Sequence, residues 1–409
     1  MVGQPATRWP AAFAALAIRD YRLLFQGNFA TQIGFGMQQI AFGWLILELS
    51  NSPFYLGLNG FFFMIPMLVV SPFGGIIADR FPRKRVLIFS QTTLMMIAVA
   101  LSALVFLKMV TIWQLMLASL LIGTIMSLNV PARQALMPEL VGRDLLGNAI
   151  ALHSMSLNAS RIIGPALAGL LIKVVGIAGC FLFQAVGYVW SVSNVLAIKT
   201  KDTTSVAKGE SPLHNLIEGF RYCYRTKTIF TMLLVASISS VFAMPSYMTL
   251  LPDYARETLG LGADGLGILL SAAGAGALVG SLGLAMARRL PKRGLIVLGA
   301  VGFTGVLLVL LSMARSILPA ILVLGGIATC NSILMVLNQS IIQEIVPDRL
   351  RGRAMSAYIM TWGLMPLGAL PLGGVAQAFG TPRAMLVSGT ICVVLAAAML
   401  VFRPDVRRI

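Results

Sequence analysis

Long apolar stretches alternate with short polar segments along the whole sequence. Each apolar stretch has about twenty residues, the length that an α-helix needs to cross a lipid bilayer. Strands with open edges would leave backbone hydrogen-bonding groups unsatisfied in lipid, so we expect helices. The pattern predicts twelve membrane spans, at Leu23–Leu47, Tyr55–Ala78, Val86–Leu107, Ile112–Ser127, Ile150–Val175, Ile177–Ile198, Ile229–Leu251, Leu266–Ala287, Leu295–Met313, Ile317–Leu337, Met355–Phe379 and Met385–Phe402.

A polar stretch between the sixth and seventh spans divides the predicted helices into two sets of six. We expect an N-terminal six-helix bundle over residues 1–198, a linker over 199–228 and a C-terminal six-helix bundle over 229–409. Within the linker, Ser211 and Pro212 are typical of a helix N-cap and first helical position. Apolar residues then recur at helical spacing, so the segment is either an amphipathic helix on the membrane surface or a solvated linker.

Composition supports an all-α polytopic membrane protein. The chain is 58% hydrophobic and 11% charged, whereas a soluble globular domain carries about 25% charged residues. The first 22 residues lack the apolar core and small-residue cleavage site of a signal peptide, so we expect the first span to direct insertion.

The basic residues predict an orientation in the membrane. With the N-terminus in the cytoplasm, 25 of the 31 Lys and Arg residues fall on the cytoplasmic side and five on the other, while Arg161 lies deep within a span. The positive-inside rule therefore predicts a multi-pass protein of the cell membrane with both termini in the cytoplasm. This placement also explains the net charge of +17 without a nucleic-acid partner.

The two halves of the sequence repeat one another. Phe81-Pro82-Arg83-Lys84 matches Leu290-Pro291-Lys292-Arg293 at an offset of 209 residues. The same offset relates Asn129, Gln134 and Pro138 to Asn338, Gln343 and Pro347. Such internal duplication is typical of secondary transporters, in which one half rocks against the other around a site at the middle of the membrane.

The stretch Gly75-x-Ile77-Ala78-Asp79-Arg80-x-x-Arg83-Lys84 resembles the loop 2–3 signature of the major facilitator superfamily, with Pro82 in place of the usual glycine. "NVPARQALMPELV", "ASRIIGPALAG" and "VPDRLRGRAMS" are similar to the branch that contains enterobactin exporters and macrolide-type drug efflux proteins. The resemblance implies a monomeric secondary active transporter that exports a siderophore or an amphiphilic drug by alternating access, coupled to protons. An importer of a nutrient or metabolite remains the alternative.

The acid of this motif predicts an electrostatic latch. Asp79 lies at the C-terminal end of span 2, where the helix dipole disfavours a carboxylate. The resemblance implies that Asp79 faces the start of span 11, near Gly352–Met355, and Arg133 of span 4. Arg80, Arg83 and Lys84 would then pair with nearby acids and lipid phosphates. Alternatively, the basic cluster only obeys the positive-inside rule.

Polar residues within the spans are candidates for the substrate pathway. Asn28, Gln32 and Gln39 fall within about 40° of one another on one face of span 1. Arg161 is the only cation deep in a span, and such a charge usually marks a functional site, with a structural hydrogen-bond hub as the alternative. Hydrogen bonding between helices is the alternative for the amides. The full set of pathway candidates is Asn28, Gln32, Gln39, Asn158, Arg161, Asn331, Tyr358 and Trp362.

Span 5 contains a run of small residues, and the middles of the spans contain no acids. Small residues in "GPALAG", namely Gly164, Pro165 and Gly169, predict close packing of span 5 and a bend. The middle of every predicted span lacks an acid, so proton coupling is implied by the resemblance alone. Because no mid-span acid is present, the candidate proton-carrying residues are Glu139, Asp79 and Glu48.

Catalysis is not expected from this sequence. It lacks paired acids, histidine clusters, a Ser–His pair at one depth and a P-loop, so we predict that the protein is not an enzyme. The two histidines and four isolated cysteines do not suggest a metal site or a cofactor.

Overall fold

A computed structural model describes residues 11–199, 221–286 and 292–403 of the protein, and these residues form helices joined by short turns. A short 3-10 helix, Ala11–Ala17, precedes the first long helix. The helices of the first half are α1 (Arg19–Ser50), α2 (Pro53–Arg80), α3 (Arg83–Phe106), α4 (Ile112–Val175) and α5 (Ile177–Ala197).

The second half begins with α7 (Lys227–Ile238), which continues through π-helical turns η2 (Ser239–Ala243) and η3 (Pro245–Thr249), the short α8 (Leu251–Asp253) and η4 (Tyr254–Thr258). It then contains α9 (Ala263–Met286), α10 (Arg293–Met313), α11 (Ile317–Ile345), α12 (Asp348–Trp362), α13 (Met365–Phe379) and α14 (Thr381–Phe402). The linker helix proposed from Ser211 and Pro212 lies outside the described residues, apart from its last turn at 221–225.

Eleven segments of the described residues are long and apolar enough to cross a membrane. Helix α1 is also long enough, since 32 residues extend about 48 Å, but amides such as Gln32 and Gln39 make it more polar than the others. Large apolar side chains such as Phe106, Val174 and Met286 are 73–81% exposed on the outer surface, as expected for side chains in contact with lipid. The prediction of an all-α polytopic membrane protein is therefore confirmed.

The fourth and fifth predicted spans are longer than expected. We expected span 4 to end at Ser127, but α4 continues through Pro131 and Pro138 to Gly142, where the chain turns back. Gly142 has φ +70, a conformation that glycine adopts without steric cost. Spans 4 and 5 therefore form a helical hairpin, and the extension of span 4 carries polar residues such as Arg133.

Two other spans are less regular than predicted. The seventh runs to Thr258 rather than Leu251, and it contains π-helical turns next to Pro245 and Pro252. Proline lacks a backbone N–H, so it interrupts the regular helical hydrogen bonds. The eleventh span is broken after Trp362, and α13 begins at Met365.

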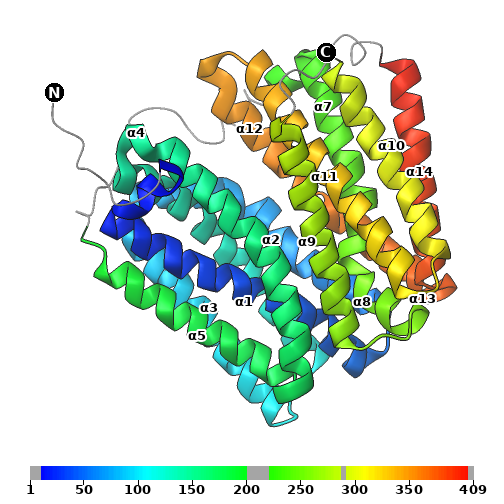
Figure 1. The fold of residues 1–409 in the computed structure, drawn as a ribbon, viewed down its shortest axis with the longest axis horizontal. Coiled ribbons are helices and arrows are strands. Elements are labelled where there is room, and N and C mark those ends of the chain that lie inside the picture. The colour runs from blue at the N-terminus through cyan, green and yellow to red at the C-terminus, as the bar shows by residue number, and fades with distance from the viewer. Residues whose placement is uncertain (1–10, 200–220, 287–291, 404–409) are drawn as a thin grey trace.

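The two halves form a V in Figure 1, with α1–α5 in one arm and α7–α14 in the other. Most helix contacts lie within an arm, as between α1 and α5 or between α10 and α14. We call the membrane side at which α1 begins and α14 ends the terminal side, and the opposite side the distal side. The arms diverge toward the terminal side and meet toward the distal side (Figure 1).

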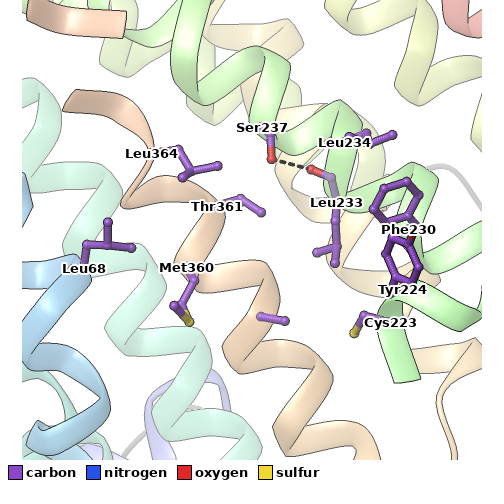
Figure 2. Close-up of a pocket in the computed structure, with 11 residues that line it drawn as sticks. Leu68, Cys223, Tyr224, Phe230, Leu233, Leu234, Ser237, Met360, Thr361 and Leu364 are labelled. Atoms are coloured by element: carbon purple, nitrogen blue, oxygen red, sulfur yellow. Dashed lines mark hydrogen bonds between the residues drawn. The ribbon is translucent and has the colours of Figure 1, made fainter. Parts of the chain in front are cut away.

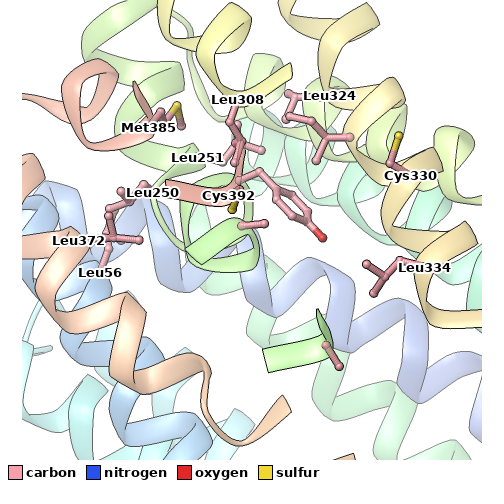
Figure 3. Packing of buried hydrophobic residues seen from close by; sticks show 14 of the residues in the cluster. Leu56, Leu250, Leu251, Leu308, Leu324, Cys330, Leu334, Leu372, Met385 and Cys392 are labelled. Atoms are coloured by element: carbon pink, nitrogen blue, oxygen red, sulfur yellow. The ribbon is translucent and has the colours of Figure 1, made fainter. Parts of the chain in front are cut away.

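Small residues bring the halves together near the distal side. A β-carbon at Gly43 of α1 would lie 2.6 Å from Pro252 Cγ in α8, and Gly373 of α13 lies against the backbone of Pro53 and Gly57 in α2. Apolar side chains continue this contact, and Figure 3 shows Leu56 of α2 beside Leu372 of α13. On the terminal side, α12 instead packs against α7 and α11 of its own half.

Candidate functional site

Arg161 lies near the middle of the membrane, where α4 faces the second half. It is exposed within the span Asp144–Val175, and its side chain forms none of the hydrogen bonds or ion pairs recorded for the described residues. Its backbone carbonyl lies against Gly274 of α9, and the next residue, Ile162, accepts a hydrogen bond of 2.9 Å from Ser271 of α9. Within the part of the chain that the structure describes, Arg161 is therefore a cation without a side-chain partner at the junction of the two halves.

The second half presents a polar pair to Arg161. Asn331 of α11 donates a hydrogen bond to the Tyr247 hydroxyl in the π-helical segment η3, and that hydroxyl lies within electrostatic range of Arg161. Asn331 was predicted from the sequence, whereas Tyr247 was not. Its position between Pro245 and Pro252 was the available signal, because irregular helices often occur at functional sites.

The three candidate amides of α1 have different surroundings. Gln39 is exposed although its neighbours Gln38 and Ile40 are buried, and Gln32 is half-buried. Asn28, toward the terminal side, is only 4% exposed. The amides share one helix face, but Asn28 belongs to a hydrogen-bonded chain inside the first half.

Arg133 forms the centre of that chain. Its guanidinium donates to the Asn28 side-chain oxygen and, at 2.6 Å, to that of Asn129. The Asn129 amide donates to Ser90 of α3 at 2.7 Å, and the Asn28 amide lies 3.1 Å from Nδ1 of His153. Arg133 also lines a small cavity of about 20 Å³ between α1, α3, α4 and α5.

The predicted latch is only partly within the described residues. The side chains of Asp79, Arg80 and Gly352 lie outside them, whereas Arg133 has the interior partners given above. The proposed contact between Asp79 and Arg133 therefore stays a prediction.

The other two cations of the motif bond within the first half. Arg83 forms an ion pair with Glu139 and donates to the Ala135 carbonyl at 2.9 Å. Lys84 donates to the carbonyls of Leu196 and Ile198 at the end of α5, at 3.1 and 2.6 Å. On the terminal side, these contacts join α3 to α4 and to the end of α5.

A mainly apolar cavity of about 240 Å³ opens between α7 and α12. Figure 2 shows Phe230, Leu233 and Leu234 of α7 facing Met360 and Thr361 of α12 across it, with Leu68 of α2 at its edge. The cavity therefore adjoins the first half as well. Its full lining is Leu68, Cys223, Tyr224, Phe230, Leu233, Leu234, Ser237, Ala357, Met360, Thr361 and Leu364.

The remaining pathway candidates lie in mixed surroundings. Tyr358 is buried and its hydroxyl lies 3.4 Å from the Met335 carbonyl, while Trp362 beside it is 38% exposed. Asn158 donates to the Ser154 carbonyl one turn earlier in its own helix, at 3.0 Å.

The small residues of "GPALAG" lie at helix crossings. A β-carbon at Gly164 would lie 2.8 Å from the Ile33 carbonyl oxygen of α1, inside the first half. One at Gly169 would lie 2.9 Å from Asp264 Cα of α9, in the second half, and the Pro165 carbonyl adjoins Gly267. This stretch of α4 therefore touches both halves.

Comparison with known proteins identifies relatives over nearly the whole chain. The model of the major facilitator family described as transmembrane secretion effectors matches residues 10–409. The staphyloferrin A transporter of Staphylococcus aureus is 28% identical, with 91% of this chain and 92% of the relative aligned. The multidrug efflux pump Tap of Mycolicibacterium fortuitum is 26% identical over 92% of this chain and 93% of its own. The enterobactin exporter EntS of Shigella boydii is 24% identical over 95% and 92%.

A solved structure has the same fold at low identity. A POT family transporter in complex with 5-aminolevulinic acid aligns with a TM-score of 0.78 at 14% identity, covering 95% of this chain and 96% of the other. The resemblance to the major facilitator superfamily predicted from the sequence is thus confirmed.

Proposed function

The chain belongs to the transmembrane secretion effector family of the major facilitator superfamily, and we propose that it exports an amphiphilic small molecule bearing an anionic group. A siderophore or an amphiphilic drug meets that description. The relatives include a siderophore exporter and a multidrug efflux pump, which supports export of this class of molecule.

The observation that carries this proposal is Arg161, which has no side-chain partner among the described residues and lies within electrostatic range of Tyr247. A charge within a membrane span is costly and usually serves a function. A carboxylate or catecholate would neutralise the guanidinium and accept hydrogen bonds from its planar donors. Arg161 belongs to one half and Tyr247 to the other, so a ligand bound there would contact both.

The apolar cavity between α7 and α12 suits the remainder of such a molecule. A mainly apolar lining favours rings and alkyl groups, with a few polar atoms to orient them. Gln32 and Gln39 of α1 would add hydrogen-bonding groups along the pathway. Substrate binding then requires both a charge and an apolar surface.

We assign the terminal side to the cytoplasm, because most Lys and Arg residues of the sequence belong to that side. The divergence of the arms toward this side then corresponds to a state that receives substrate from the cytoplasm. Closing there and opening at the distal contacts would release substrate outside. In that second state, Asp79 and the start of α12 would form the latch.

Transport would be driven by protons and carried out by a monomer in the cell membrane, without a nucleic-acid partner or a catalytic step. The six-plus-six division at residues 199–228 would separate the two moving units. The twelve-span count agrees with this division when α1 is included.

Transport into inside-out vesicles tests the proposal. Vesicles containing the protein should accumulate a catecholate siderophore or a carboxylate siderophore when a proton gradient is imposed, and Arg161→Ala should abolish that uptake. Arg383→Ala is the control, because it also removes one arginine charge, and Arg383 is exposed near the start of α14 on the distal side. Accumulation of the same compounds only by right-side-out vesicles would instead support an importer.

A further inference from the structure

His153 forms one end of a hydrogen-bonded chain that runs through the first half. The chain passes from His153 to Asn28, Arg133, Asn129 and Ser90. It connects the two spans of α4, on either side of Gly142, to α1 and α3. Of its members, only His153 changes its charge near neutral pH.

The donors of the chain fix the protonation state of His153. Arg133 can only donate hydrogen bonds, so the Asn28 side-chain oxygen must face it. The Asn28 amide nitrogen, which is also a donor, is thereby turned toward His153 Nδ1, 3.1 Å away. Nδ1 must then accept, so His153 is neutral in this conformation and carries its proton on Nε2.

Protonation would break this arrangement. An imidazolium donates from both nitrogens, so Nδ1–H would face the donating amide of Asn28. Asn28 could turn its oxygen to His153 only by turning its amide nitrogen toward Arg133. The His153 imidazolium and the Arg133 guanidinium would thus compete for the Asn28 side-chain oxygen. If His153 takes that oxygen, Arg133 loses Asn28 as an acceptor.

Arg133 has a second acceptor available nearby. The side-chain oxygen of Gln91 is buried and forms no hydrogen bond with the described residues. Gln91 and Arg133 line the same small cavity, so a guanidinium released from Asn28 could bond to Gln91. The first half thus offers Arg133 a second acceptor that could replace Asn28.

Several of the charged and titratable groups on the elements around His153 bond elsewhere. Glu139 of α4 pairs with Arg83, Arg22 of α1 donates to the Leu16 carbonyl, and Tyr21 donates to the Ala149 carbonyl. Asp20 pairs with Arg19, Tyr188 of α5 lines the cavity with Arg133, and Asp144 and Arg161 lie on the same helix as His153, nine residues before and eight after. Among the described residues, Arg133 is the cation joined to His153 through Asn28, and its charge opposes an imidazolium there.

We propose that His153 is a proton-binding site, and that a proton bound there breaks the Asn28–Arg133 hydrogen bond and disfavours the state open to the terminal side. A proton from solution would bind Nδ1, and loss of that proton to the terminal-side solution would restore the chain. As a coupling mechanism this rests on the proposed export function. The proton-binding site itself does not.

Nitrogen NMR of histidine tests the site directly, because the chain has only two histidines. In 15N-histidine-labelled protein carrying His214→Asn, all signal comes from His153. We expect the Nε2–H tautomer at pH 8 and conversion to the imidazolium, with Nδ1 also protonated, as the pH is lowered. Asn28→Asp should move the midpoint upward by about one pH unit or more, since a carboxylate accepts from the imidazolium.

Spin labels then test the consequence. Leu196 and Phe402 are 57% and 79% exposed at the terminal ends of opposite halves, and labels there should lie closer at pH 5 than at pH 8. His153→Gln, which cannot titrate, should abolish this change. The proposal is overturned if His153 stays neutral to pH 5, carries its proton on Nδ1, or can be replaced by glutamine without loss of the pH-dependent distance. No transported compound is needed, so these results do not depend on the export assignment.

Discussion

Arg83 at the start of α3 forms an ion pair with Glu139 of α4, on the terminal side of the first half. The second half has a counterpart, in which Arg293 at the start of α10 forms two hydrogen bonds of 2.8 and 2.7 Å to Glu344 of α11. Both pairs join the third and fourth spans of their halves. They differ in burial, because the Arg83 and Glu139 side chains are 14% and 22% exposed, whereas those of Arg293 and Glu344 are 32% and 53% exposed.

This difference predicts unequal effects on stability. Glu139→Gln should lower the free energy of unfolding by about 1–3 kcal/mol, because it leaves a partly buried Arg83 without its counter-charge. Glu344→Gln should cost about 0.2–1 kcal/mol, since water screens that pair. A dye that fluoresces on reaction with the four buried cysteines can follow thermal unfolding of both variants. Equal shifts in Tm would contradict the assignment of a stronger pair to the first half.

Loss of the charge at Arg161 should impair transport without loss of expression. Removing a charge-assisted hydrogen bond costs about 1.5–3 kcal/mol, so Arg161→Gln should reduce the apparent affinity for an anionic substrate about 10- to 100-fold. Arg161→Lys should retain part of it, because it keeps the charge but not the planar donor set. Binding of candidate substrates to purified protein provides the measurement. Full affinity in Arg161→Gln would return Arg161 to a structural role.

The predicted latch gives a kinetic test. Asp79→Asn should slow the transport cycle about fivefold, as expected for loss of about 1 kcal/mol of ion pairing in one state, while substrate affinity stays near that of the native protein. The corresponding position of the second half is Arg288, so the latch is expected on one side of the repeat only. Native turnover in Asp79→Asn would remove the latch from the account.

The packing of "GPALAG" predicts that two glycines of one helix have different effects. Gly164→Val should destabilise the first half, because the side chain would meet the Ile33 carbonyl 2.8 Å from its β-carbon. Gly169→Val should instead disturb the contact with Asp264 of the other half and change transport more than stability. Thermal unfolding and vesicle uptake, measured on both variants, would separate the two effects. Identical behaviour of the two variants would contradict this division.

The hydrophobic pattern predicted the fold because lipid requires long apolar helices and leaves few alternatives. It failed at Ser127, where polar residues were taken for a loop. Asn129 and Arg133 are in fact helical, and they bond to one another and to Ser90 and Asn28 inside the first half. Hydropathy cannot distinguish a polar side chain in water from one that is paired within a bundle.

The candidate site was predictable only where a single residue carried the signal. Arg161 was identifiable because one cation in a long apolar span is exceptional. Tyr247 and His153 were not, since their roles depend on contacts with Asn331 and Asn28, which are 84 and 125 residues away in sequence. Spacing within one helix could place Asn28 and Gln39 on one face but could not show that Asn28 is buried.

The central claim is that two rigid halves rock about contacts that close the distal side. Gly43→Leu would insert a side chain against Pro252, 2.6 Å from the β-carbon position, and so force the distal side open. Gly299→Leu is the matched control, because no atom lies within 4 Å of a β-carbon there.

The most direct measurement follows two spin-label distances in the Gly43→Leu protein. One pair, at Leu196 and Phe402, reports the terminal side, and the other, at Phe106 and Met313, which are 78% and 68% exposed, reports the distal side. Rocking predicts that the distal distance lengthens while the terminal distance shortens, with neither changed by Gly299→Leu. A longer distal distance with an unchanged terminal distance would contradict the account.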